Sequence, residues 1–121
     1  MADIITSHGI NRVMAMIGGV ETVNPFKYLA IGTGTTTASA SDTALENEID
    51  RGEATVTLND NELQFVHTFS FSASQAITEM GIFNASTGGD ILTRSTFGAI
   101  NVSNGDSLQI TATLSSVQGN E

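Results

Sequence analysis

The run Gly32-Thr33-Gly34 is the part of this chain that comes closest to a motif with known chemistry. Glycines that follow a strand can bind phosphate through backbone N–H groups. A dinucleotide-binding loop, however, needs a third glycine where Thr37 stands and a long helix directly after it, while a P-loop needs Gly-Lys followed by Ser or Thr. Lys27 is the only lysine in the chain. We therefore interpret the two glycines as the end of a strand, where they adopt positive φ angles, rather than as a phosphate-binding loop.

His8 and His67 are the only histidines. His67 could serve a nucleophilic triad only if a serine and a carboxylate converged on it. No serine of the chain lies in a Gly-x-Ser-x-Gly sequence, which would mark an exposed nucleophile. We expect His67 to be a packed strand residue with one hydrogen bond and His8 to lie in an N-terminal arm. No catalytic residue is expected, and the chain is predicted not to be an enzyme.

Carboxylates gather in one segment, where they could bind a hard cation such as calcium. This segment contains Asp42, Glu46, Glu48, Asp50 and Glu53, and a smaller polar group consists of Asn59, Asp60, Asn61 and Glu62. Neither has the spacing of a calcium-binding loop, so we expect a solvated helix face and a turn, with no metal or cofactor. Paired carboxylates of the glycoside hydrolase type stay open, although an aromatic content of 6% offers little for a sugar platform.

Net charge limits the partners that the chain can have. Its 121 residues include 13 acidic and 4 basic side chains, for a net charge of −9. Nucleic-acid backbones and anionic membranes attract clustered Lys and Arg, so we expect neither as a partner. Arg51 and Arg94 stand beside predicted strand residues. Each could form an internal ion pair or reach a partner, and we favour internal pairs.

Cysteine and hydrophobic patterns exclude several further classes. The chain has no cysteine and therefore no disulfide, thiol nucleophile or thiolate zinc site, which fits assembly in a reducing cytoplasm. No apolar run reaches the roughly 18 residues of a membrane span. Residues 1–5 lack the basic segment that opens a signal peptide.

Residues 1–24 differ in pattern from the rest and are predicted to form an N-terminal arm. Ile10, Val13, Met14 and Ile17 recur at the spacing of one helical face, and Gly18-Gly19 ends the helix after Ile17. A helix this short must dock, either on its own core or on a neighbouring subunit. We favour its own core, with Met14 and Met16 as packing residues.

Residues 25–121 are predicted to form one β-sandwich domain. Tyr28–Ile31 is a strand, and Thr43-Ala44-Leu45-Glu46 fits the capping box of a short helix ending near Ile49. Alternating patterns then predict a hairpin of 54–58 with 63–71, strands at 77–84, 91–97 and 108–114, and a second hairpin turn at Asn104-Gly105. Gly81 marks a bulge or a close approach. We expect a frayed tail at 117–121. The predicted fold is all-β, an antiparallel β-sandwich (jelly-roll-like) with one short helix after the first strand and a short helical N-terminal arm.

Four stretches in series resemble a family of small virion proteins of tailed bacteriophages. The first two are Tyr28–Thr36, similar to the family's "aiGtGtt" strand, and Ser41–Arg51, similar to its "DTaL..E..R" helix. The others are Ile77–Asn84, similar to "i.EiGlF", and Ile91–Phe97, similar to "llaRs.f", followed by a closing strand over 106–114. Met80 and Thr93 depart from the usual pattern, where a β-branched residue and an alanine are commoner.

The resemblance implies a structural part of a virion. The leading hypothesis is a non-enzymatic decoration (cement) protein that binds the outer surface of the capsid and bridges major capsid subunits. A tail, baseplate or fibre component is the alternative, and a carbohydrate- or cell-surface-binding module is an alternative of another class. The resemblance also implies a homo-oligomer, with a trimer as one option, and the major capsid protein or tail proteins as partners. The partner-binding residues stay open.

Overall fold

The computed structural model describes residues 2–116, which form eight strands and one helix. In chain order these are β1 (Ala2–Ile5), α1 (Ser7–Gly18), β2 (Tyr28–Gly32), β3 (Glu48–Glu53), β4 (Thr55–Asn59), β5 (Glu62–Ser70), β6 (Gln75–Phe83), β7 (Ile91–Val102) and β8 (Ser107–Ser115). No helix in the described part of the chain is long and apolar enough to cross a membrane. The predicted frayed tail, residues 117–121, lies outside the described residues.

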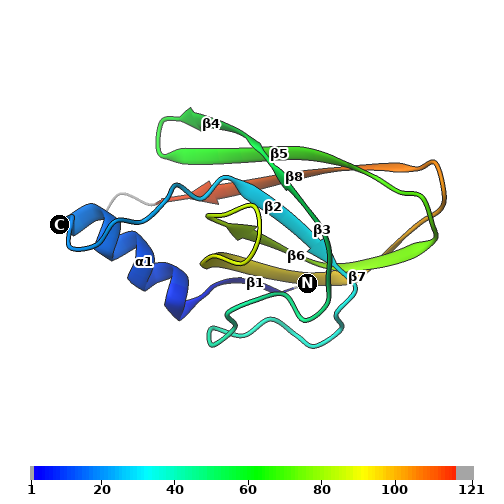
Figure 1. Ribbon diagram of the computed structural model, residues 1–121, viewed down its shortest axis with the longest axis horizontal. Helices are drawn as coiled ribbons and strands as arrows, with labels where there is room; N and C mark the ends of the chain where they lie inside the picture. Colours follow the sequence, from blue (N-terminus) through cyan, green and yellow to red (C-terminus); the bar gives the residue numbers. More distant parts are fainter. Residues whose placement is uncertain (1, 117–121) are drawn as a thin grey trace.

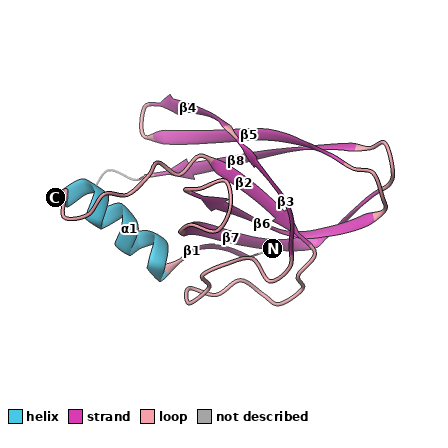
Figure 2. Cartoon of the chain, viewed as in Figure 1, coloured by secondary structure: helices cyan, strands magenta, loops and turns pink. Residues whose placement is uncertain are grey.

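The strands form two antiparallel sheets, seen as two layers in Figure 1. The larger sheet has the order β1-β7-β6-β2-β3, and the smaller has the order β4-β5-β8. At one side β3 runs almost directly into β4 through the buried Ala54, so the chain passes there from one sheet to the other. At the opposite side, β1 and β8 each pair with one strand only. The strand content confirms the all-β prediction (Figure 2).

The core lies between the two sheets and follows the period-two pattern of the sequence. Phe65 and Phe69 of β5 are almost fully buried and pack with Leu29 and Ile31 of β2 and Ile77 of β6. The predicted hairpin of β4 and β5 is confirmed, with Asp60 at a φ angle of 55° in its turn. Alternation placed the core face of β5 correctly, because Phe65 and Phe69 on that face pack on the other sheet. The whole of β4 is exposed, including the alternating Val56 and Leu58.

The helix predicted over Thr43–Ile49 is wrong. Residues 41–47 form turns and bends, and β3 begins at Glu48. The reason is a competing partner for the backbone: the N–H groups of Glu46 and Asn47 donate to the side chain of Glu79, on β6. A helix cap would have satisfied such N–H groups locally, but the distant carboxylate satisfies them here. The described residues therefore contain one helix, α1, which lies before β2, the first strand predicted from the sequence.

The structure also decides two predictions made at glycines, the close approach or bulge at Gly81 and the hairpin turn at Asn104-Gly105, and the second is wrong. The register of β6 is regular at Gly81, and a Cβ there would lie 3.0 Å from Leu45 Cδ2 and from the carbonyl oxygen of Thr93, so the close-approach alternative holds. Gly105 does adopt a φ angle of 90° in a turn. That turn is not a hairpin, however, because β7 and β8 lie in different sheets and β8 pairs with β5.

The N-terminal arm is tied into the larger sheet. The four residues of β1, which the sequence pattern did not indicate, pair with β7 from Ala2↔Thr96 to Ile5↔Thr93. The predicted helix is confirmed as α1: the Thr6 hydroxyl caps its first turn by accepting from Gly9 N, and Gly19 ends it in the left-handed region. The division into an arm of residues 1–24 and a domain of residues 25–121 stays a prediction.

Candidate functional site

The two glycines of the Gly32-Thr33-Gly34 run enclose an anion, but that anion is a side chain of the same protein. Gly34 N donates to Oε2 of Glu79 at 2.8 Å. A Cβ on Gly32 or on Gly34 would collide with the Glu79 carboxylate. Neither glycine has a positive φ angle, so that prediction is wrong. Glycine is needed here because the carboxylate approaches the backbone closely.

Glu79 is the centre of this arrangement, and sequence reasoning missed it as a site residue. Its carboxylate is fully buried and accepts from the backbone N–H groups of Gly34, Glu46 and Asn47 at 2.8–2.9 Å and from Arg94 Nε at 3.0 Å. A signal was present: Glu79 is the single charge in the apolar segment Ile77–Phe83. A buried charge needs a partner, and the following strand offers Arg94 as its only base.

Arg94 completes the network from β7. Its side chain is 2% exposed, and each of its three nitrogens has a partner. Nε binds Glu79, Nη1 binds Asp42 at 2.9 Å, and Nη2 donates to the carbonyl oxygen of Thr36 at 2.8 Å. Burial lowers the pKa of Arg94, but the bonds to Asp42 and Glu79 outweigh it and raise that pKa above its ordinary value. The favoured internal ion pair is confirmed.

Four of the stretches that carried the family resemblance meet in this network, and the closing strand over 106–114 does not take part. The glycine run, the Asp42–Glu46 segment, Glu79 and Arg94 come from four separate parts of the chain, and their contacts hold the loop of residues 33–47 against β6 and β7. Both carboxylate oxygens of Glu79 and all three side-chain nitrogens of Arg94 have partners within the protein. The network therefore fixes the loop.

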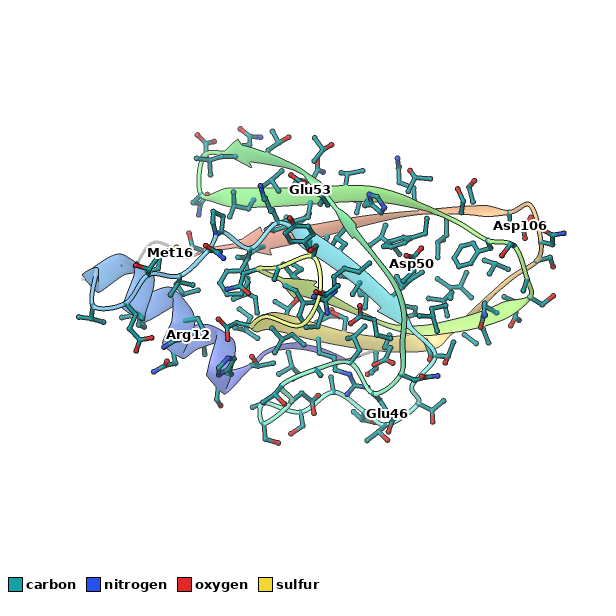
Figure 3. All side chains as sticks on the ribbon, in the orientation of Figure 1. Arg12, Met16, Glu46, Asp50, Glu53 and Asp106 are labelled. Atoms are coloured by element: carbon teal, nitrogen blue, oxygen red, sulfur yellow. The ribbon has the colours of Figure 1, made fainter. Side chains whose placement is uncertain are left out.

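The acidic segment does not assemble into a cation site. Asp42 pairs with Arg94, Glu46 accepts from Thr35 N and Thr36 N, and Glu48 pairs with Arg51. The remaining two, Asp50 and Glu53, lie along β3, away from Glu46 in its loop (Figure 3). No group of three or more acidic or histidine side chains that could hold a metal ion occurs within residues 2–116. The predicted solvated helix face is wrong, because the segment is a loop and a strand.

Glu46 is held by the start of its own loop. The Thr36 hydroxyl and the N–H groups of Thr36 and Thr35 all donate to its carboxylate, and these bonds lower the pKa of Glu46 below its ordinary value. The smaller polar group is a turn, as predicted: Asp60 and Asn61 join β4 and β5, and Asn61 Nδ2 donates to the carbonyl oxygen of Ser116.

Arg51 ties β3 to the loop between β6 and β7. Its guanidinium lies 3.8 Å from the ring centroid of Phe83, pairs with Glu48 at 2.6 Å, and donates to the carbonyl oxygens of Ala85 and Gly88. A cation over an aromatic face is stabilising, more so when it is shielded from water. Arg51 is thus also internal, as favoured.

The two histidines have different partners. His67 is half-buried and packs edge-to-face on Phe69, with ring centroids 4.6 Å apart, and against Gly52. His8 pairs with Asp90 at 2.6 Å and so fastens α1 to the start of β7. Burial raises the pKa of Asp90, but the hydrogen bonds from His8 and Asn84 outweigh it, and the net change is a lowered pKa.

The helix α1 presents an unpartnered apolar surface. It docks on its own chain through Gly9, Val13 and Ala15, so the prediction of an own-core contact holds for these residues only. Ile10, Met14 and Ile17, here called the outer face of α1, are 53%, 59% and 74% exposed. Met16, labelled in Figure 3, is exposed as well, so both methionines were wrongly assigned to packing.

A comparison with models of known protein families found no match, and a search of curated proteins found none either. The function of this chain must therefore be inferred from its own residues and geometry. The outer face of α1 is the surface in the described residues that needs an explanation, because single exposed apolar residues are ordinary but a contiguous face is a mark of contact with another molecule.

Proposed function

We propose that this chain is a non-enzymatic structural protein of a bacteriophage virion, a decoration protein that binds the outer surface of the capsid and bridges major capsid subunits. The observation that carries the proposal is the outer face of α1. Ile10, Met14 and Ile17 stand exposed on one side of a helix that its own ends hold firmly in place. A rigid apolar helix face is a common means of docking on another protein.

The distribution of charge fits the same proposal. No acidic residue occurs between Asp3 and Glu21, although the chain has 13 of them. The helix α1 itself therefore carries no carboxylate, although Asp90 and Glu21 pair with its His8 and Arg12. β3 and the loops carry much of the acidic charge. In the proposed arrangement α1 faces the capsid subunits, and the acidic surfaces face solvent, where they favour solubility.

If many copies bind one capsid lattice, each contact with a capsid subunit can be weak. Each outer face is small, but copies of an oligomer that contact several capsid subunits at once gain from a high effective concentration. The proposal includes a homo-oligomer and a jelly-roll-like sandwich as the finer description of the two sheets.

Point substitutions on α1 test the proposal without damaging the fold. Ile17→Glu together with Met14→Glu should abolish binding to capsids that lack the protein, because charges replace the apolar contact. Leu58→Glu is the matched control, since Leu58 is an apolar residue of similar exposure, 69%, on β4. Binding that survives the α1 substitutions, or is lost equally in the control, would refute the role of this face.

Imaging of intact virions distinguishes the capsid from the tail as the location of this protein. Density on the capsid lattice supports decoration, and density only on the tail contradicts it.

A further inference from the structure

The two sheets differ in width, and the difference leaves a groove at one side. Five strands of the larger sheet face three of the smaller. Since β3 continues into β4 at one side, the missing width lies at the other, between β8 and β1. A groove of about 810 Å³ opens there, with an apolar floor and walls formed by Ile4, Met80, Ile82, Phe97, Ile110 and Leu114.

Beside this groove, β8 is a long edge strand with none of the features that usually protect an edge. Its nine residues pair with β5 from Ser107↔Ser70 to Ser115↔Glu62, and no described strand pairs with its other side. The backbone groups on that side form a template for another strand. Natural edges are protected by charge, proline or shortness, whereas residues 107–115 contain no charged residue and no proline.

The other three edges are better protected. β1 has four residues and carries Asp3, and β3 carries the charges of Glu48, Asp50, Arg51 and Glu53. β4 has no charge, but it has five residues, and the groove does not reach it. In a chain with a net charge of −9, two copies repel each other. That repulsion is locally weakest where a long edge carries no carboxylate.

The sequence of β8 is complementary to itself. Two antiparallel copies centred on Thr111 would pair Ile110 with Ala112, and Leu108 with Leu114. Because side chains alternate between the two faces, apolar residues then meet apolar residues, and the exposed Gln109 and Thr113 meet each other. The added strand would also continue the smaller sheet across the groove and place its apolar side chains over the groove.

We propose that β8 is the docking edge for β8 of a second copy of this chain. The two three-stranded sheets become one six-stranded sheet about a two-fold axis at Thr111, and each copy covers the apolar groove of the other. This is an isologous contact, in which the same surface is used by both copies. It is independent of the capsid-binding role of α1, and it differs from the trimer, which was one option for the homo-oligomer that the family resemblance implies.

The test uses the purified full chain and needs no capsid. Sedimentation of the wild-type protein over a wide range of concentration should reveal a monomer–dimer equilibrium. Thr111→Lys sets two like charges against each other at the axis and should raise the dimer dissociation constant at least about tenfold. Thr57→Lys, at the centre of β4 on the opposite edge of the same sheet, replaces a threonine that is also exposed and should leave the dissociation constant unchanged.

A cross-link provides a second, positive readout. Because the chain has no cysteine, Thr111→Cys introduces a single thiol that two copies would bring together across the axis. Oxidation should convert it to a covalent dimer much faster than Thr57→Cys. A wild-type protein that stays monomeric, a trimer, a dimer that Thr111→Lys does not weaken, or equal cross-linking of the two cysteine variants would each overturn the proposal.

Discussion

Arg94 Nε lies 3.0 Å from Glu79 Oε1, and neither side chain is more than 2% exposed. The two residues come from β6 and β7 and stand in the interior at the point where the loop of residues 33–47 closes over the larger sheet. A buried ion pair contributes little when compared with an apolar replacement, but breaking it leaves one charge without its partner. Four predictions about stability follow from this network and from the docking of α1.

Glu79→Gln should lower the free energy of unfolding by about 3–5 kcal/mol, because Arg94 then stays buried with one carboxylate fewer and the amide cannot accept all the bonds that the carboxylate accepts. Urea denaturation measures the change. The matched control is Glu53→Gln, which breaks the exposed pair of Lys27 and Glu53 (3.3 Å) and should cost less than about 1 kcal/mol. Similar losses of unfolding free energy in the two variants would show that the buried network contributes no more to stability than the exposed ion pair.

Gly34→Ala should destabilise the protein by about 1–3 kcal/mol, because the added methyl group collides with the side chains of Glu46 and Glu79. Gly98→Ala is the control: a Cβ there meets no atom within 4 Å, and Gly98 has no positive φ angle. Thermal unfolding of the two variants compares them directly. If Gly34→Ala were as stable as Gly98→Ala, the close approach of the Glu79 carboxylate would be wrong.

The loop of residues 33–47 should loosen at acid pH through Glu46. The bonds from Thr36 and Thr35 hold the pKa of Glu46 below the ordinary value of 4.5, so the folded state favours the ionised carboxylate. The stabilisation is therefore fully present above the ordinary pKa and disappears as the pH falls through the lowered value. NMR titration of the Glu46 carboxyl group, with amide exchange at Thr35 and Thr36, follows both effects. Glu46→Gln should remove the pH dependence of the protection of these two amides, measured relative to intrinsic exchange, whereas a Glu46 pKa at or above 4.5 would contradict the prediction.

Thr6→Val should cost about 1–2 kcal/mol, because it removes the buried hydroxyl that caps α1 by accepting from Gly9 N at 2.8 Å. The same hydroxyl lies against the carbonyl oxygens of Ile91 and Leu92, so the cap also attaches the arm to β7. Hydrogen exchange should show the greatest loss of protection in β1 and α1. Thr6→Ser keeps the oxygen and should retain most of the stability, and an equal loss in both variants would argue against a capping role.

Local patterns predicted the elements whose partners are near in sequence or whose core face alternates regularly. The hairpin of β4 and β5 and the strands β6 and β8 are examples, as is α1 with its stop at Gly18-Gly19. The same patterns failed for the segment Thr43–Ile49. Its capping-box residues suit a helix, but the backbone there bonds to Glu79, more than 30 residues away.

The sequence by itself determined that this chain is a β protein with a short amphipathic helix near its N-terminus, because periods of two and of 3.6 residues are local properties. Only the tertiary structure decided what the conspicuous residues do. Gly34 and Glu79 are 45 residues apart, yet position 34 needs a glycine because the Glu79 carboxylate occupies the space that a side chain would fill. The side of α1 that faces outward, and the edge of β8 that lacks a neighbour, likewise depend on which strands pair. Those pairings are set by packing between distant segments, which no short window of sequence contains.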